Sequence, residues 1–187
     1  MKKAFTLIEM VVSISVIAMI SSMFIANYRS ANKRTDLILA AQNLVASLHA
    51  AQNNALGLAE YNGAVPAGGW GISLATSSNS YTMFADLEAP GVLGNLAYDP
   101  VAEGNVNYGA RVTLLPAGVT ISNFETATAS STSAANVTFL PPDPQTNIYN
   151  AAGGGTSTSL QITLKESPNN TVKTIRVNFL GLVEVID

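Results

Sequence analysis

The chain has 187 residues, which is room for one domain of ordinary size and an appendage. Apolar residues make up 48% of it and charged residues only 11%, so much of the surface must consist of Ser, Thr, Asn, Gly and Ala. With no cysteine, the sequence excludes disulfides, thiolate zinc sites and cysteine nucleophiles. Beyond residue 35, four basic residues stand against eleven acidic ones, and this net charge of −7 disfavours a surface that follows nucleic-acid phosphates.

A basic leader, residues 1–4, runs directly into an apolar segment, residues 5–26. As a helix rising about 1.5 Å per residue, this segment is about 33 Å long, enough to cross a hydrocarbon core of about 30 Å. The buried helix of a soluble protein is rarely so long and so apolar on all sides. A cleaved secretory signal peptide has a shorter apolar region followed by small residues, whereas bulky Phe24 stands near the end of this one. The sequence therefore predicts a membrane-spanning helix.

The orientation of this span follows from what flanks it. Lys2 and Lys3 favour a cytoplasmic N-terminus, although three basic residues between 29 and 34 nearly balance them on the other side. The large polar region beyond the helix favours the arrangement in which that region lies outside the cytoplasm. We therefore predict a single-pass protein of the cytoplasmic (inner) membrane.

Glu9 is the one acidic residue of the apolar segment. Burying a charge in hydrocarbon costs about 3 kcal/mol or more, so an ionisable residue at this place indicates a function. The function that we predict is a charge whose partner belongs to another subunit.

The helix is expected to continue well beyond the membrane, because no glycine occurs before Gly57 and no proline before Pro66. One stripe of apolar residues at steps of three and four follows this second half and predicts packing on a globular head: Leu37, Ala41, Leu44, Leu48, Ala51, Ala55 and Leu58. A single helix over 5–58 would be about 80 Å long.

After Gly57, short β-rich runs alternate with Gly, Pro, Ser and Thr. The expected strands are 70–74, 81–86, 111–115, 119–122, 137–140, 160–165, 172–178 and 182–186. The expected loops are 75–80, 89–109, 126–135 and 141–159, with a turn at 179–182 before the last strand. Three aromatic residues are expected in the core: Trp70, Tyr81 and Phe84. The predicted fold class is α+β, an antiparallel sheet packed on the second half of one long helix.

Few residues suggest catalysis or metal binding. His49 is the only histidine and lies on the polar side of the helix, so a metal site or a Ser-His pair is disfavoured. Asp86, Glu88 and Asp99 lie loosely around loops, where carboxylates can bind calcium. Without a spacing signature, we interpret them as solvated loop charges. The sequence thus predicts no catalytic residue, no metal, no cofactor and no enzyme activity.

The segment Lys3-Ala4-Phe5-Thr6-Leu7-Ile8-Glu9 resembles the processing site of type IV pilins and type II secretion pseudopilins. The resemblance implies that a prepilin peptidase cuts between Ala4 and Phe5, that the new N-terminus at Phe5 is methylated, and that Glu9 is the assembly glutamate. The family usually has glycine before the cut, and Ala4 is the smallest substitute for it.

The rest of the chain resembles the H-type pseudopilin and FimT-like branch of minor pilins. The resemblance lies in 40–55 of the helix, in Gly69-Trp70-Gly71-Ile72-Ser73-Leu74, in Tyr81-Thr82-Met83-Phe84-Ala85-Asp86 and in the closing 175–185. FimT-like proteins that bind DNA carry arginines after the final glycine. Here Gly181 is followed by acidic and apolar residues, so DNA binding is not carried over.

The resemblance implies a pilin-like fold divided into a leader (1–4), a transmembrane and assembly half (5–26), an amphipathic half (27–58) and a β-rich head (59–187). It implies a structural subunit of a type IV pilus or a type II secretion filament, periplasmic or extracellular after assembly. The implied partners are other pilin or pseudopilin subunits, the prepilin peptidase, the inner-membrane assembly platform and, before assembly, membrane lipid. The alternative is a filament-tip binding module that engages a secreted substrate, a surface or, less favoured, DNA.

Overall fold

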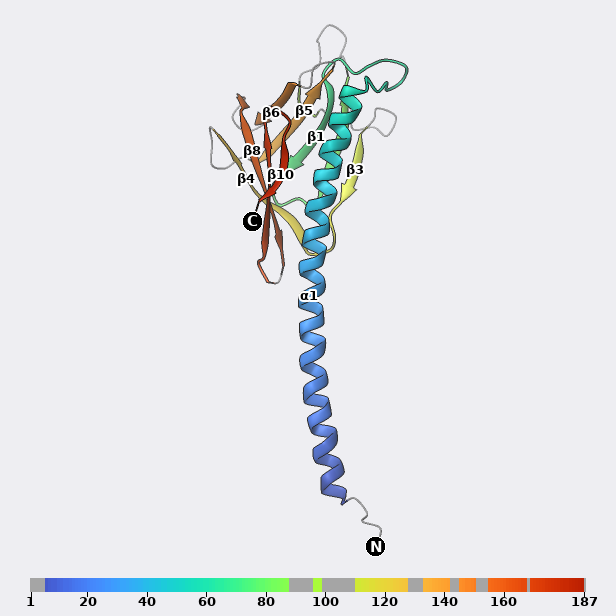
Figure 1. Ribbon diagram of the computed structural model, residues 1–187, viewed down its shortest axis with the longest axis vertical. Helices are drawn as coiled ribbons and strands as arrows, with labels where there is room; N and C mark the ends of the chain where they lie inside the picture. Colours follow the sequence, from blue (N-terminus) through green and yellow to red (C-terminus); the bar gives the residue numbers. More distant parts are fainter. Residues whose placement is uncertain are drawn as a thin grey trace.

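The computed structural model describes residues 6–87, 96–98, 110–127, 133–141, 145–150, 155–167 and 169–186. Its main feature is one helix, α1 (Leu7–Leu56), whose 50 residues give a length of about 75 Å. Figure 1 shows the N-terminal half of α1 as a stalk that projects from the head. The long helix predicted from the sequence is confirmed.

The predicted apolar stripe runs past the end of α1. Gly57 caps the helix, and its N–H donates to the Asn53 carbonyl at 2.8 Å. Leu58 then takes a left-handed conformation at φ +51° and is 47% exposed. Its predicted place in the stripe is therefore wrong, because the 3.6-residue period stops at the cap.

The rest of the stripe is buried as the sequence predicts, with Ala40 added to it. The buried side chains of α1 are Leu37, Ala40, Ala41, Leu44, Leu48, Ala51 and Ala55, each at most 2% exposed. Four of these seven are alanine, whose small side chain lets the head approach the helix axis closely. The core thus lies between the second half of α1 and the head.

The described residues of the head form two antiparallel sheets. The six-stranded sheet has the order β3 (Arg111–Leu114), β2 (Ser80–Asp86), β1 (Gly69–Ala75), β5 (Ala134–Leu140), β6 (Gln145–Asn150) and β7 (Gly155–Ser157). The four-stranded sheet has the order β10 (Val183–Ile186), β9 (Val172–Asn178), β8 (Ser159–Glu166) and β4 (Val119–Thr126). The α+β class is confirmed, but the head holds two sheets where one was expected.

The predicted loop 141–159 is wrong in part, because it contains β6 and β7. The sequence of β6 is Gln-Thr-Asn-Ile-Tyr-Asn, in which strand-favouring Thr, Ile and Tyr are mixed with Gln and strand-disfavouring Asn. Thr146 and Ile148 are buried there. Pairing with β5 along the whole of β6 orders this short mixed segment. The predicted loop 126–135 likewise loses its last two residues to β5.

Among the described residues, the polar contacts between the head and α1 involve the second half of the helix. The Tyr81 hydroxyl lies 2.8 Å from the Ser47 hydroxyl and donates to the Asn43 carbonyl at 3.3 Å. At the predicted turn before the last strand, the Gly181 carbonyl accepts from Gln52 Nε2 at 3.5 Å. Gly181 has φ +80°, and an added Cβ would lie 2.6 Å from Gln52 Nε2, so this close approach requires glycine. The turn itself is confirmed.

Candidate functional site: the exposed assembly helix and the head groove

Thr6 is the N-cap of α1, and it holds the first turn together. Its Oγ1 accepts a hydrogen bond from the Glu9 backbone N–H at 3.3 Å. Thr6 and Glu9 have the spacing of a capping box, in which a Thr cap is followed by Glu at the third helical position. The sequence interpretation gave Glu9 a role between subunits and missed this local one, although the pattern was there to find. Ala4 and Phe5, the predicted cleavage and methylation residues, lie outside the described residues.

The Glu9 carboxylate has no protein partner in the part of the chain that the structure describes. The residue is exposed, and its side chain makes neither an ion pair nor a hydrogen bond with those residues. It lies in the first turn of α1, where the helix dipole favours a negative charge. Among the described residues, therefore, the helix end is its main compensation, and none of them occupies the carboxylate.

The apolar segment is also not covered by other described residues. Thirteen large apolar side chains between Leu7 and Ile25 are each at least 51% exposed. The helix is long and apolar enough to cross a membrane, with a mean hydropathy of 2.2 over its most apolar window. Three of its serine hydroxyls bond to carbonyls of the same helix: Ser13 to Glu9 at 2.7 Å, Ser15 to Val11 at 2.8 Å and Ser22 to Met19 at 2.8 Å. These hydroxyls therefore do not need water, which suits a hydrocarbon environment.

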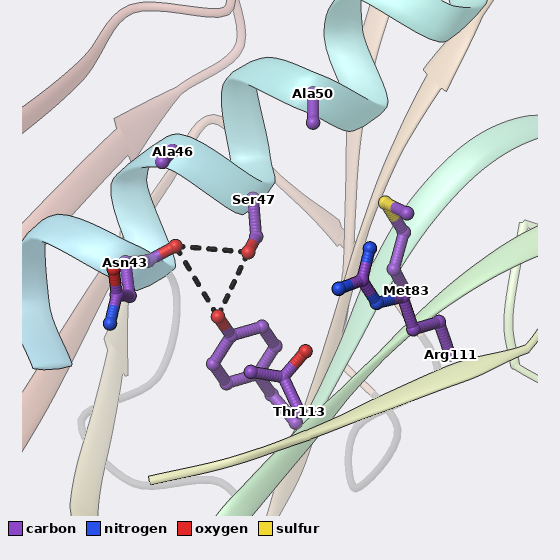
Figure 2. Close-up of a pocket in the computed structure, with 8 residues that line it drawn as sticks. Asn43, Ala46, Ser47, Ala50, Met83, Arg111 and Thr113 are labelled. Atoms are coloured by element: carbon purple, nitrogen blue, oxygen red, sulfur yellow. Dashed lines mark hydrogen bonds between the residues drawn. The ribbon is translucent and has the colours of Figure 1, made fainter. Parts of the chain in front are cut away.

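A second feature is a groove of about 290 Å³ between the helix and the outer strands of the six-stranded sheet (Figure 2). Its lining residues are Asn43, Ala46, Ser47 and Ala50 of α1, Tyr81 and Met83 of β2, and Arg111 and Thr113 of β3. Figure 2 shows the Arg111 side chain reaching toward the helix beside Met83. Arg111 makes no ion pair with any described residue, so among those residues the groove presents a positive charge beside hydroxyls without a carboxylate partner.

Of the residues weighed for metal or calcium binding, the structure describes His49 and Asp86, and neither belongs to a group of three potential metal ligands. His49 is exposed, with Nδ1 3.4 Å from Gln52 Oε1. Asp86 is only 1% exposed and accepts from the Leu96 N–H at 2.7 Å, so its interpretation as a solvated loop charge is wrong. Gly68 leaves the space that the Asp86 carboxylate fills. Glu88 and Asp99 lie outside the described residues. Across the described ranges, no group of three potential metal ligands occurs.

The predicted core aromatics Trp70, Tyr81 and Phe84 are buried. Trp70 Nε1 donates to the Ala59 carbonyl at 3.1 Å, which ties the chain after the helix to β1. These rings are therefore part of the packing and are not available as a ligand platform. On the C-terminal hairpin, Arg176 Nε lies 3.1 Å from Glu184 Oε1 in the facing strand, so this arginine is already paired.

The fold and the exposed helix define a stalk-and-head protein whose stalk needs lipid or other helices around it. The first 25 residues match a family model described as the prokaryotic N-terminal methylation motif, which belongs to type IV pilins and pseudopilins. No curated protein and no solved structure matches the chain. The motif at 1–25 and the helix-and-sheet arrangement together give a pilin-type precursor N-terminus on an architecture consistent with the pilin fold.

Proposed function

We propose that this chain is a minor pilin or pseudopilin of the H-type, FimT-like kind, a structural subunit of a type IV pilus or type II secretion filament. The observation that carries the proposal is the row of exposed apolar side chains on a helix that opens with the methylation motif. Such a surface must be covered, first by lipid in the inner membrane and then by the helices of other subunits. The divisions 1–4, 5–26, 27–58 and 59–187 correspond to leader, assembly half, amphipathic half and head.

In this proposal Glu9 sets the register between subunits. Cleavage between Ala4 and Phe5 creates a free amine, which is then methylated. The amine of one subunit pairs with the Glu9 carboxylate of its neighbour, so two charges are neutralised together. A desolvated ion pair adds little net stability, but leaving one of its members unpaired is strongly unfavourable. Glu9 therefore contributes more to selecting the correct register between subunits than to the stability of the filament.

The leader has a physical role before the cut. Until cleavage no amine exists at Phe5, and Lys2 and Lys3 hold the terminus at the cytoplasmic surface. The prepilin peptidase and the inner-membrane assembly platform are the partners at this stage, and the head lies outside the cytoplasm. Processing thus separates storage in the membrane from entry into the filament.

The processing step is tested by mass spectrometry of the native N-terminus. We expect a chain that begins at Phe5 and carries one methyl group. The same preparation should contain co-purifying pilin or pseudopilin subunits. A chain that retains Met1 in the assembled material would contradict the proposal.

The assembly step is tested with Glu9→Leu in the full chain. We expect the variant to insert in the membrane at the wild-type level and to be lost from sheared filaments. Glu60→Leu removes the same charge from an exposed position after the helix, and we expect it to assemble normally. Wild-type amounts of Glu9→Leu in filaments would refute the role of Glu9.

A filament-tip binding module is the second candidate, and the groove around Arg111 favours it. An uncompensated arginine among hydroxyls suits an anionic group on a secreted substrate or a surface. Arg111→Gln separates the two, because it should abolish capture of an anionic ligand by a tip module and leave the assembly of a purely structural subunit unchanged. DNA is disfavoured as the ligand by the net charge of −7 beyond residue 35 and by the Arg176–Glu184 pair. We expect no gel shift of DNA at any salt concentration.

A further inference from the structure

A polar notch lies where the apolar segment ends. The turn between β8 and β9 lies below the rest of the head, alongside α1 (Figure 1). The helix and this turn together enclose about 420 Å³, lined by Asn27, Ser30, Ala31, Arg34, Asn169 and Thr171. Apart from Ala31, each lining side chain carries a hydrogen-bonding group.

The helical residues of the notch share one face, because they recur at steps of three and four. Long side chains on a helix generally lean toward its N-terminus, so from its position Arg34 can reach over Ser30 toward the apolar segment. Arg34 is exposed and makes no ion pair or hydrogen bond with the residues that the structure describes. Its guanidinium is therefore a cation without a partner among those residues, and it borders the notch.

The depth of the notch matches the headgroup layer of a bilayer. The apolar segment ends at residue 26, so the backbone of Asn27 lies about 1.5 Å beyond it and that of Arg34 about 12 Å beyond. The polar layer on each side of the hydrocarbon core is about 5–7 Å thick. Asn27 and Ser30 thus fall within this layer, and Arg34 lies just above it with a side chain long enough to reach down.

Most of the basic residues after the leader also lie at this end of the head. Of the seven basic residues after the leader, five occupy positions on the turns of α1 beside the notch or on the strands that flank the β8–β9 turn: Arg29, Lys33, Arg34, Lys165 and Lys173. Two carboxylates of the described residues lie nearby. Asp36 is 3.7 Å from Lys33 Nζ, and buried Glu166 accepts from Asn169 Nδ2 at 3.3 Å. Within the described part of the chain, basic residues thus outnumber carboxylates at this end of an otherwise acidic head.

We propose that this notch seats the phosphate of an anionic phospholipid headgroup while the subunit is stored in the membrane. Arg34 binds two phosphate oxygens, and Asn27, Ser30 and Thr171 donate hydrogen bonds to the others. The inference rests on the membrane-inserted stage of the proposed function and deepens it. The contact holds the head at one height above the bilayer, and it is given up when the subunit enters a filament.

The test uses the full chain in nanodiscs of phosphatidylcholine with about one-third phosphatidylglycerol, and native mass spectrometry to count retained lipid. We expect the wild type to retain phosphatidylglycerol and Arg34→Gln to bind it about fivefold more weakly, the effect of one basic residue near an anionic surface. Arg34→Lys keeps the charge and should fall between them. Arg176→Gln is the matched control, because it removes the same charge from β9 outside the notch, where Arg176 already pairs with Glu184, and it should equal the wild type.

A second readout reports the position of the turn. Since the chain has no cysteine, Ser167→Cys gives a single site for a spin label on the β8–β9 turn. We expect this label to lie in the headgroup layer in the wild type, and Arg34→Gln to move it toward water. An unchanged label position would overturn the proposal, as would equal lipid retention in Arg34→Gln and the wild type.

Two further outcomes would also overturn it. An equal loss in Arg176→Gln would show a diffuse effect of charge. An Arg34→Gln variant that keeps its lipid but crosslinks poorly to other subunits would assign the notch to a protein contact. Membrane insertion distinguishes a failure of this inference from a failure of the proposed function. A chain that does not enter nanodiscs contradicts both, whereas one that inserts without dependence on Arg34 contradicts the lipid site alone.

Discussion

The two halves of α1 lie on one continuous helix and are covered in opposite ways. Between Leu7 and Ile25 apolar side chains face all directions, and each large one is at least half exposed. Between Leu37 and Ala55 a single stripe is buried under the head, while Gln42, Asn43 and other polar residues face outward. The second half therefore finds its partner within the chain. The first half must find it in another molecule, whether lipid or a second subunit.

The largest expected effect comes from Leu44→Ala, which removes a fully buried side chain of the second half. Such truncations cost about 2–5 kcal/mol, because the lost contacts leave a cavity. Leu39→Ala is the matched control, since Leu39 is 48% exposed on the same helix, and it should cost about 0.5 kcal/mol or less. Urea unfolding of the full chain in detergent, followed by the fluorescence of Trp70, measures both. Equal losses would mean that the stripe does not hold the head.

Tyr81→Phe should have the next largest effect. The Tyr81 hydroxyl joins β2 to Ser47 and Asn43 of α1, and losing such a partly buried hydrogen bond costs about 1 kcal/mol. Tyr28→Phe removes a hydroxyl from an exposed side chain just beyond the apolar segment and should leave the free energy of unfolding unchanged. The same urea titration compares them. A loss in Tyr28→Phe as large as that in Tyr81→Phe would show that the Tyr81 hydroxyl does not anchor the head specifically.

Thr6→Ala should act on the first half alone. Loss of the N-cap bond to the Glu9 N–H costs about 1 kcal/mol locally, which corresponds to about fivefold faster amide exchange in the first turn. The stability of the head should not change, because no contact of the head depends on this turn. Thr35→Ala is the control, since Thr35 Oγ1 bonds to the Ala31 carbonyl inside the helix. Unchanged exchange at residues 7–9 would show that Thr6 is not the effective cap.

The smallest effect is expected at the junction of the two halves. Lys33 Nζ donates to the Ala117 carbonyl at 2.6 Å and lies near Asp36, but the side chain remains partly exposed. We expect Lys33→Met to cost about 0.5 kcal/mol, and less at high salt because exposed charges are screened. Arg34→Gln at the next position should cost nothing in the same titration. A loss above that of Tyr81→Phe would show that the junction, more than the stripe, anchors the head.

The sequence by itself determined the long helix, its buried stripe and most of the strands. Each of these depends on a local pattern: the 3.6-residue period ending at Gly57, β-rich runs between turn residues, and Gly181 at a turn that needs positive φ. The N-terminal motif is local as well, which is why residues 1–25 are enough to match the methylation family model. The capping role of Thr6 was also readable from its spacing to Glu9.

Only the tertiary structure decided how the head is divided and where its polar groups lie. β6 is ordered by pairing with β5, a partner that its own polar residues do not reveal. Asp86 is buried because Gly68 and the Leu96 N–H meet it there. The groove at Arg111 and the notch at Arg34 each join the helix to strands or a turn far away in sequence. Period and composition report which face of an element is apolar, but they carry no information on which distant segment covers that face.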